Sequence, residues 1–247
     1  MAGAADPPYG TDLAYVHDTG FGDIAWGAAR ELLKRLAERG PDGGLVVDLG
    51  CAAGRLVSPV VDAGYDGLGI DISPAFVGMA RQAEPRARFE VGSVHEADLP
   101  PCVAVTAIGE VLGYLPAPDP NAIPFETTLQ RVADALPAGG LFLFDLILAG
   151  EAPSLTRRGW RAGDDWAVLS DVTEDPSGGY LTREIVTFRD TGDGSYRRRD
   201  EVHYARLFDP AGIEASLDAL GFAVERASTY DGVALPPRRA AFICRRL

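Results

Sequence analysis

The stretch from Gly44 to Leu56, GLVVDLGCAAGRL, constrains the fold of this chain more than any other part of its 247 residues. It begins with a short apolar run, Leu45 to Leu49, which only Asp48 interrupts. Glycines bound the run on both sides, which is typical of a strand buried on both faces of a parallel sheet. Small residues come next, and the apolar residues after them predict the start of a helix. Strand, tight turn and helix in this order indicate a nucleotide-binding α/β fold, because small side chains let a ligand lie against bare backbone.

The turn itself lacks the G-x-G-x-x-G fingerprint of dinucleotide-binding folds, since Ala52 stands at the middle glycine and Arg55 at the third. It resembles instead the D/E-x-G-x-G-x-G motif of class I S-adenosylmethionine-dependent methyltransferases, with alanine for the middle glycine. S-adenosylmethionine has no phosphate, so its turn need not bind a pyrophosphate at a helix N-terminus. An NAD enzyme and a turn without ligand are the alternatives. The resemblance implies S-adenosylmethionine as the cofactor and a binding turn that contains Asp48, Gly50, Cys51, Ala52 and Gly54.

A second apolar run, residues 67–73, ends in an acid that supports nucleoside binding. Asp71 lies about twenty positions after Gly50, at the end of the next predicted strand, where an acid accepts hydrogen bonds from ribose hydroxyls. Both candidate cofactors carry that ribose. Asp71 is alternatively a helix cap, but Ser73 followed by Pro74 suits the cap better and leaves Asp71 free for ligand. We expect Ile72 to contact the same nucleoside.

Two later segments add residues to the predicted cofactor site. Residues 87–100 predict a third strand followed by a loop, and the resemblance implies that Ser93 and Val94 hold the adenine, with His95 solvated beside them. Residues 102–115 predict a fourth buried strand that ends at Gly109 and Glu110. Ligands of open α/β sheets lie outside the carboxyl ends of the strands.

We therefore place Gly109 and Glu110 near the reacting end of the cofactor, with Tyr114 close to the substrate. Glu110 is either a functional group or the cap of the next helix, and Gly109 would allow a close approach of substrate. Residues 136–147 resemble the L-x-P-G-G turn and fifth strand of class I methyltransferases. Asp145 at the end of that strand either lines the substrate pocket or caps the next segment of the chain.

The N-terminal forty residues predict a helix with a segment before it. Apolar residues recur every four positions from Ile24 to Leu36, Asp23 is a candidate cap, and Gly40 ends the helix. The resemblance implies that this helix covers the cofactor and that the preceding segment acts as a lid. We interpret that segment as a glycine-flanked loop in which Tyr15, His17 and Phe21 enclose substrate, the alternative being ordinary packing with a solvated His17.

Asp6 to Tyr9 spell D-P-P-Y, which amino-group methyltransferases acting on DNA bases carry after a strand. Only five residues precede the tetrapeptide, so no such strand fits. We interpret it as a chance match in a flexible arm.

From Trp160 to Phe208 the pattern changes to strand, turn, strand, which predicts an antiparallel meander inserted after the fifth strand. Small-molecule methyltransferases, including sugar N-methyltransferases, carry similar insertions that roof the substrate site. His203 shares a strand face with Glu201. It is either a base on the roof or a surface residue whose hydrogen bonds are already formed.

The C-terminal segment, helix, strand, loop and strand, resembles the close of the class I fold, in which the last strand is antiparallel. The predicted fold is α/β: a Rossmann-like, seven-stranded methyltransferase sheet with the inserted β meander. We divide the chain into an N-terminal arm and lid helix, a cofactor-binding core, a β substrate roof and a C-terminal part of the core, at residues 1–40, 41–150, 151–208 and 209–247.

The composition of the chain limits the kinds of partner that we expect it to bind. The net charge of −13 and pI near 4.6 oppose binding to nucleic acid. Cys51, Cys102 and Cys244 are scattered without metal-ligand spacing, so we expect reduced thiols and no metal. Neither a signal peptide nor a membrane span is visible, and a soluble, cytoplasmic protein is expected. The oligomeric state stays open.

The expected function is transfer of a methyl group from S-adenosylmethionine to an N or O atom of a small molecule. A hydroxyl or protonated amine requires a general base, and we rank Glu110 and His17 before His203. An NAD(P)-dependent oxidoreductase is the alternative, but Arg55, a single lysine at Lys34 and the lack of a Tyr-x-x-x-Lys set disfavour it. A nucleoside-binding protein without catalysis is the third possibility.

Overall fold

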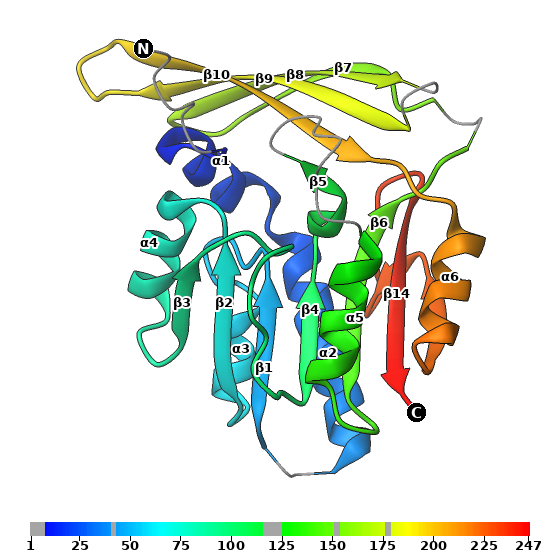
Figure 1. The fold of residues 1–247 in the computed structure, drawn as a ribbon. Helices are drawn as coiled ribbons and strands as arrows, with labels where there is room; N and C mark the ends of the chain where they lie inside the picture. The colour runs from blue at the N-terminus through cyan, green and yellow to red at the C-terminus, as the bar shows by residue number, and fades with distance from the viewer. Residues whose placement is uncertain (1–7, 41–42, 116–124, 151–153, 176–178) are drawn as a thin grey trace, which may run out of the picture.

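The described residues form two layers of strands, in which an antiparallel sheet lies across one end of a larger sheet flanked by helices (Figure 1). The computed structural model describes residues 8–40, 43–115, 125–150, 154–175 and 179–247. The larger sheet has the strand order β11-β14-β6-β4-β1-β2-β3. Its strands are β1 Leu45–Leu49, β2 Asp66–Asp71, β3 Arg88–Val91, β4 Ala104–Ala107, β6 Leu141–Ile147, β11 Phe222–Ala227 and β14 Arg239–Arg246.

The topology of this sheet confirms the predicted class I fold. Strands β3, β2, β1, β4 and β6 pair in parallel, whereas β14 is antiparallel to both β6 and β11. From β1 the chain proceeds outward through β2 and β3 and then returns to β4 on the other side of β1. Ligands of such sheets bind at this switch point, outside the carboxyl ends of β1 and β4.

Helices cover both faces of the sheet and bury its central strands β1, β4 and β6. Helices α2 Asp23–Arg39, α3 Val57–Asp62 and α4 Pro74–Ala83 lie on one face, and α5 Phe125–Ala135 and α6 Pro210–Ala219 lie on the other. All seven residues of β6 are buried, as expected for a strand covered on both faces. A short hairpin, β12 Thr229–Tyr230 and β13 Val233–Ala234, packs on α2.

The smaller sheet, which we call the roof, spans the top of the molecule in Figure 1. It has the order β5-β10-β9-β8-β7, with β5 Tyr114–Leu115, β7 Arg157–Ala162, β8 Trp166–Asp175, β9 Tyr180–Asp190 and β10 Tyr196–Arg206. Strands β8, β9 and β10 form the predicted antiparallel meander, and β7 adds an edge strand that the sequence pattern does not predict. The fifth, β5, precedes α5 in the chain, and the sequence pattern does not predict it in this sheet.

The strand predicted within residues 102–115 ends at Ala107, close to the predicted end at Gly109 and Glu110, but the sequence does not predict the path of the chain after them. Strand β4 ends at Ala107, and Gly109 and Glu110 take left-handed conformations with φ of 91° and 62°. A 3-10 turn, Val111–Gly113, then leads to β5. These two left-handed residues redirect the chain, so the apolar residues after them join the roof instead of extending β4.

The interpretation of the N-terminal segment as a loop is also wrong. Residues Thr11–Phe21 form helix α1, which packs between the roof and α4. Gly20 suits this packing because a Cβ atom there would lie 2.9 Å from the indole of Trp166. Asp23 is the first residue of α2 and Gly22 its N-cap, so Asp23 does not cap the helix.

No helix in the described ranges is both long and apolar enough to cross a membrane.

Candidate active site

The turn after β1 brings three strand ends together. The amides of Gly50 and Cys51 both donate to the carbonyl of Ile70 on β2, at 2.7 and 3.2 Å. Gly50 has a φ of 71°, and a Cβ atom there would overlap the side chain of Val111, which lies beyond the end of β4. Only glycine suits this position, because the backbone is left-handed and the neighbouring loop lies against it.

Asp71 at the end of β2 lies directly against this turn. Its Oδ2 accepts the amide of Ala52 and its Oδ1 the amide of Ser73, each at 2.9 Å. Ser73 caps α4 through the Phe76 amide, as predicted, but Asp71 is engaged by two amides and is not a free group. Burial raises the pKa of Asp71, and the two amides oppose that rise. Each carboxylate oxygen keeps a further lone pair that can accept a ribose hydroxyl.

The side chains of Asp48 and Cys51 point away from the turn surface into the core. Thr106 Oγ1 donates to Asp48 Oδ1 at 2.6 Å, and burial raises the pKa of Asp48 to about 7. The Cys51 thiol packs against Gly69, and burial raises its pKa well above the usual value. Any contact of Cys51 with a ligand on this side would therefore come from its backbone.

The loop after β3 begins beside Asp71. The amide of Gly92 donates to the Asp71 carbonyl at 2.9 Å, which places Ser93 and Val94 next to the acid, with Ile72 on its other side. His95 is not solvated, contrary to the sequence interpretation. Its Nδ1 lies 3.0 Å from Thr128 Oγ1 on α5, and burial lowers its pKa.

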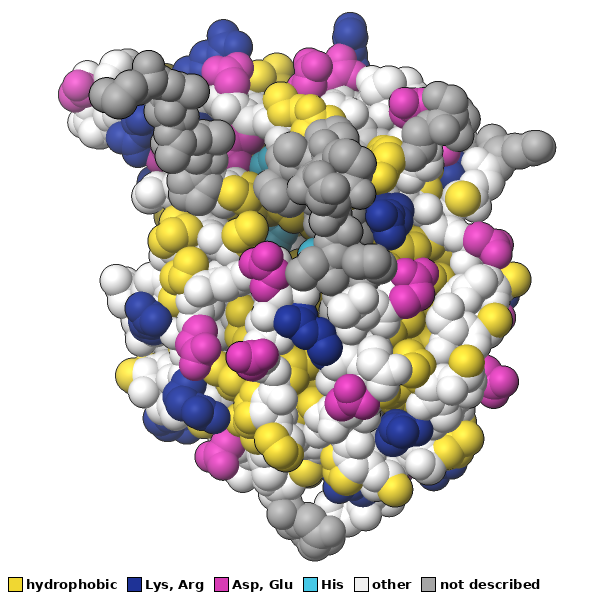
Figure 2. Space-filling view, viewed as in Figure 1, with side chains coloured by type: hydrophobic (Ala, Val, Ile, Leu, Met, Phe, Trp, Pro, Cys, Tyr) yellow, Lys and Arg dark blue, Asp and Glu magenta, His cyan; other side chains and the backbone are white. Residues whose placement is uncertain are grey.

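Five rings fill the space between the turn and the roof, and we call them the aromatic cluster: Tyr9, His17, Phe76, Tyr114 and His203. The ring centroid of Tyr9 lies 4.7 Å from that of His203, 5.3 Å from Phe76, 5.5 Å from His17 and 6.0 Å from Tyr114. Figure 2 shows histidine side chains recessed where the roof meets the core. The cluster lies over the switch point, since Tyr9 also packs near Ala52.

Tyr9 is a site residue that the sequence pattern does not single out, since its segment is interpreted there as a flexible arm. Its carbonyl accepts Ser73 Oγ at 2.7 Å, and burial raises the pKa of its phenol to about 12. Asp6 and Pro7 of the same tetrapeptide lie outside the described residues. The sequence signals for Tyr9 are the D-P-P-Y match and its place two positions before the first residue of α1.

His203 is buried under the roof, which excludes one of its two alternatives, that of a surface residue. Its Nε2 lies 2.9 Å from Glu201 Oε2, while Nδ1 has no hydrogen-bond partner in the described part of the chain. The Glu201 carboxylate also accepts the amides of Tyr9 and Gly10, at 2.8 and 3.0 Å. One carboxylate thus anchors both the imidazole and the segment that carries Tyr9.

Of the three residues predicted to enclose substrate from the lid, His17 lies in the cluster and Phe21 stacks on His17 at its edge, with ring centroids 6.0 Å apart. Burial lowers the pKa of His17 to about 4, so it is neutral at pH 7. The Tyr15 hydroxyl lies 3.2 Å from Asp165 at the roof, and the Phe21 side chain is 45% exposed. Tyr15 therefore packs against the roof, where Arg189 also lies over its ring, and not in the cluster.

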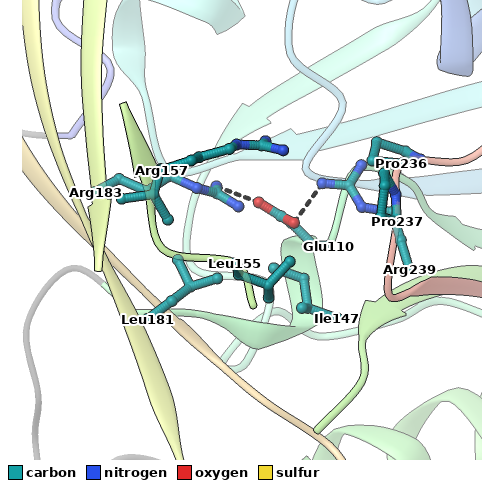
Figure 3. A pocket seen from close by; sticks show the side chains of 10 residues that line it. Glu110, Ile147, Leu155, Arg157, Leu181, Arg183, Pro236, Pro237 and Arg239 are labelled. Carbon is teal, nitrogen blue, oxygen red and sulfur yellow. Dashed lines mark hydrogen bonds and ion pairs between the residues drawn. The ribbon is translucent and has the colours of Figure 1, made fainter. Parts of the chain in front are cut away.

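Glu110 is held between two arginines, which the sequence does not predict. Its carboxylate forms ion pairs with Arg183 of the roof and Arg239 of β14 (Figure 3). Burial raises the pKa of Glu110, but the two guanidinium groups outweigh it and lower the pKa to about 2. A carboxylate of such low pKa is a weak base at neutral pH, so this geometry favours a positioning role over general-base catalysis.

Asp145 is fully buried and holds the loop after β4. It accepts the amides of Gly109 and Glu110, at 2.9 and 2.8 Å, and burial raises its pKa. Asp145 therefore positions the neighbouring turn and does not face the aromatic cluster. Tyr114 is the one predicted substrate residue outside the lid that lies in that cluster.

Arg55, which stands where a dinucleotide fold has its third glycine, links the turn to the lid helix. Its Nε donates to Asp18 Oδ1 at 2.6 Å and its Nη2 to the Asp18 carbonyl at 2.8 Å. Helix α1 is thus tied to the turn at one end and to the roof at the other.

Comparisons with known proteins agree with this geometry. A family model described as a methyltransferase domain matches residues 23–227. No curated protein matches the sequence significantly. Among solved structures, the chain is similar to an S-adenosylmethionine-dependent methyltransferase from Clostridium acetobutylicum, with a TM-score of 0.78 and 16% identity over 95% of this chain and 97% of that one.

The names of two further proteins of similar structure state the class of substrate on which they act. The sugar N-methyltransferase KedS8 from a Streptoalloteichus species has a TM-score of 0.76 and 21% identity, over 100% of this chain and 98% of that one. The amino pentose methyltransferase CalS10 from Micromonospora echinaspora, bound to S-adenosylmethionine, has a TM-score of 0.74 and 18% identity, over 95% and 97%. At these identities the likeness establishes a common fold.

Proposed function

The chain belongs to the methyltransferase-domain family of class I S-adenosylmethionine-dependent methyltransferases, and we propose that it methylates an amino group of a small, sugar-like acceptor. Family membership sets aside the NAD(P)-dependent oxidoreductase and the nucleoside-binding protein without catalysis. Family membership gives the methyltransferase activity, and the proposal adds the acceptor group, an amine, and the substrate class, a sugar-like molecule. They rest on the names of KedS8 and CalS10 and on the site described above.

The contact between the Ala52 amide and Asp71 is the observation that supports the proposal most directly. It joins the small-residue turn to the acid at the switch point, where Asp71 can accept ribose hydroxyls while Ser93 and Val94 offer backbone to the adenine. No atom of the described residues lies within 4 Å of a Cβ built on Gly109, so bare backbone leaves room at the reacting end.

When bound, S-adenosylmethionine supplies a sulfonium methyl group whose transfer disperses positive charge. The protein therefore contributes mainly by aligning the acceptor and excluding water. The roof and α1 cover the aromatic cluster from above, and ring faces suit the apolar face of a sugar. Because its phenol pKa is raised to about 12, Tyr9 stays protonated and keeps its hydrogen-bond donor.

His203 is the residue that the geometry favours as general base. A carboxylate only accepts hydrogen bonds, so Glu201 assigns the proton of a neutral imidazole to Nε2 and leaves a lone pair on Nδ1. That lone pair can take the proton that the acceptor nitrogen loses. The acceptor nitrogen would gain the methyl group and lose this proton to His203, and S-adenosylmethionine would leave as S-adenosylhomocysteine. His17, neutral and on the other side of Tyr9, is the second candidate.

Calorimetry and mass spectrometry test the proposal together. We expect the purified protein to bind S-adenosylmethionine and S-adenosylhomocysteine but neither NAD nor NADP. With S-adenosylmethionine, an amino sugar should gain one methyl group, whereas the analogue with a hydroxyl in place of the amine should not. Methylation of the hydroxyl analogue alone would contradict the choice of an amine.

A further inference from the structure

We propose that three arginines beneath the roof, Arg157, Arg183 and Arg239, bind an oxyanion carried by the acceptor. They line one pocket together with Glu110 and apolar side chains that include Leu155 and Leu181 (Figure 3). The inference rests on the proposed function only in identifying the ligand as the acceptor. The pocket itself is argued from the register of the strands and from the charges that face it.

Strand register places this pocket in line with His203. Arg157 is opposite Val172, Val172 is opposite Arg183, and Arg183 is opposite His203. Residues directly opposite each other project from the same face of a sheet. The two arginines and the histidine therefore all point from the underside of the roof toward the core.

The spacing of the strands gives the size of ligand that would span the site. Neighbouring strands lie about 5 Å apart, so Arg183 is about 5 Å and Arg157 about 15 Å from His203 along this row. An acceptor whose amine lies at Nδ1 of His203 would reach the arginines with a group attached on the far side of its ring. A charged substituent at the end of a small molecule fits that separation.

Charge favours an anion at this position. Glu110 pairs with Arg183 and Arg239, and Asp145 lies 3.5 Å from Nε of Arg239. Arg157 has no carboxylate partner in the part of the chain that the structure describes, so three cations face two carboxylates.

One positive charge is therefore in excess, within a protein of net charge −13. The nearby Glu174 does not cancel it, because Glu174 is paired with Arg238.

The chemistry of guanidinium groups points to a carboxylate or a phosphate. A planar guanidinium donates two parallel hydrogen bonds to such oxyanions, and charge-assisted bonds of this kind are strong in partly buried sites. Figure 3 shows the Arg157 side chain extending across the pocket above Glu110. The apolar side chains around it suit the uncharged part of the ligand.

Titration calorimetry of the full chain with pyrophosphate and, separately, with malonate tests the inference. The variant is Arg157→Ala, and the matched control is Arg158→Ala. Arg158 is the next residue on β7, projects from the opposite face and pairs with Asp171. Each variant removes one exposed positive charge from β7. A difference in anion affinity between the two variants would therefore come from a specific pocket and not from the general loss of charge.

We expect the wild-type protein to bind at least one of the two anions, with an affinity about tenfold weaker in Arg157→Ala and within about twofold of wild type in Arg158→Ala. Preference for pyrophosphate would identify a phosphate-bearing acceptor, and preference for malonate a carboxylate. Equal losses in the two variants, or no binding of either anion by wild type, would overturn the inference.

Titration of S-adenosylmethionine into the same samples separates this inference from the proposed function. Binding of S-adenosylmethionine without anion binding would contradict the arginine pocket alone. Anion binding that depends on Arg157, without binding of S-adenosylmethionine, would support the pocket and contradict the proposed function.

Discussion

His203 and Glu201 lie on the same face of β10, with Nε2 of the imidazole 2.9 Å from Oε2 of the carboxylate. The same carboxylate holds the amides of Tyr9 and Gly10. The roof, the N-terminal segment and the imidazole therefore share one anchor. In our account Glu201 is a positioning residue that acts through His203.

Replacing Glu201 by Gln should lower kcat while leaving S-adenosylmethionine binding nearly unchanged. A neutral amide cannot stabilise the imidazolium that forms, so we expect kcat to fall by about 10- to 100-fold, with an altered pH profile of kcat. Glu184→Gln, on an exposed and outward-facing position of β9, is the control. A variant with the kcat and pH profile of the wild type would exclude this role.

His17 should make the free energy of unfolding depend on pH. Its pKa is lowered from 6.5 to about 4 in the folded state, chiefly by burial. Between those values the unfolded chain binds the extra proton, so stability rises with pH, by up to about 1.4 kcal/mol per pH unit. Stability is therefore lost as the pH falls from 6.5 toward 4.

Urea unfolding at pH 7 and pH 5 measures this contribution. We expect the wild type to lose about 2 kcal/mol more than His17→Asn over this interval. His95 and the carboxylates are common to both proteins, so their contributions cancel in the comparison. Equal losses would show that His17 titrates normally in the folded protein.

Gly50→Ala should be much more destabilising than Gly64→Ala. Both glycines have positive φ, 71° and 90°, but an added Cβ overlaps Val111 at position 50, whereas at position 64 it has no neighbour within 4 Å among the described residues. Backbone strain is common to the two variants, and steric overlap adds about 1–3 kcal/mol at position 50. Similar unfolding free energies in urea would mean that the loop after β4 moves aside easily.

The parts of the fold that the sequence predicts correctly depend on local pattern. The turn after β1, the acid at the end of β2, the Ser73 cap and the largely apolar, fully buried β6 each leave a pattern within a few residues. Such patterns arise from backbone conformation and burial, which neighbouring residues determine.

The parts that the sequence does not predict depend on contacts between distant segments. Gly20 and Gly22 look like loop residues, yet they make room for Trp166 and Arg55 against helix α1. Glu110 looks like a base in the sequence because its partners, Arg183 and Arg239, are more than seventy positions away. No local sequence pattern reveals ion pairs between residues so far apart in the chain. Such ion pairs nevertheless set the pKa of a carboxylate and so decide whether it can act as a base.

The central claim is that the turn after β1 and the acid at the end of β2 together hold S-adenosylmethionine. Calorimetric titration of Asp71→Asn tests it most directly, with Asp66→Asn at the exposed start of the same strand as the control. We predict that the dissociation constant for S-adenosylmethionine rises about tenfold or more in Asp71→Asn and is unchanged in the control. Equal affinity in all three proteins, or binding of NAD in place of S-adenosylmethionine by the wild type, would contradict the account.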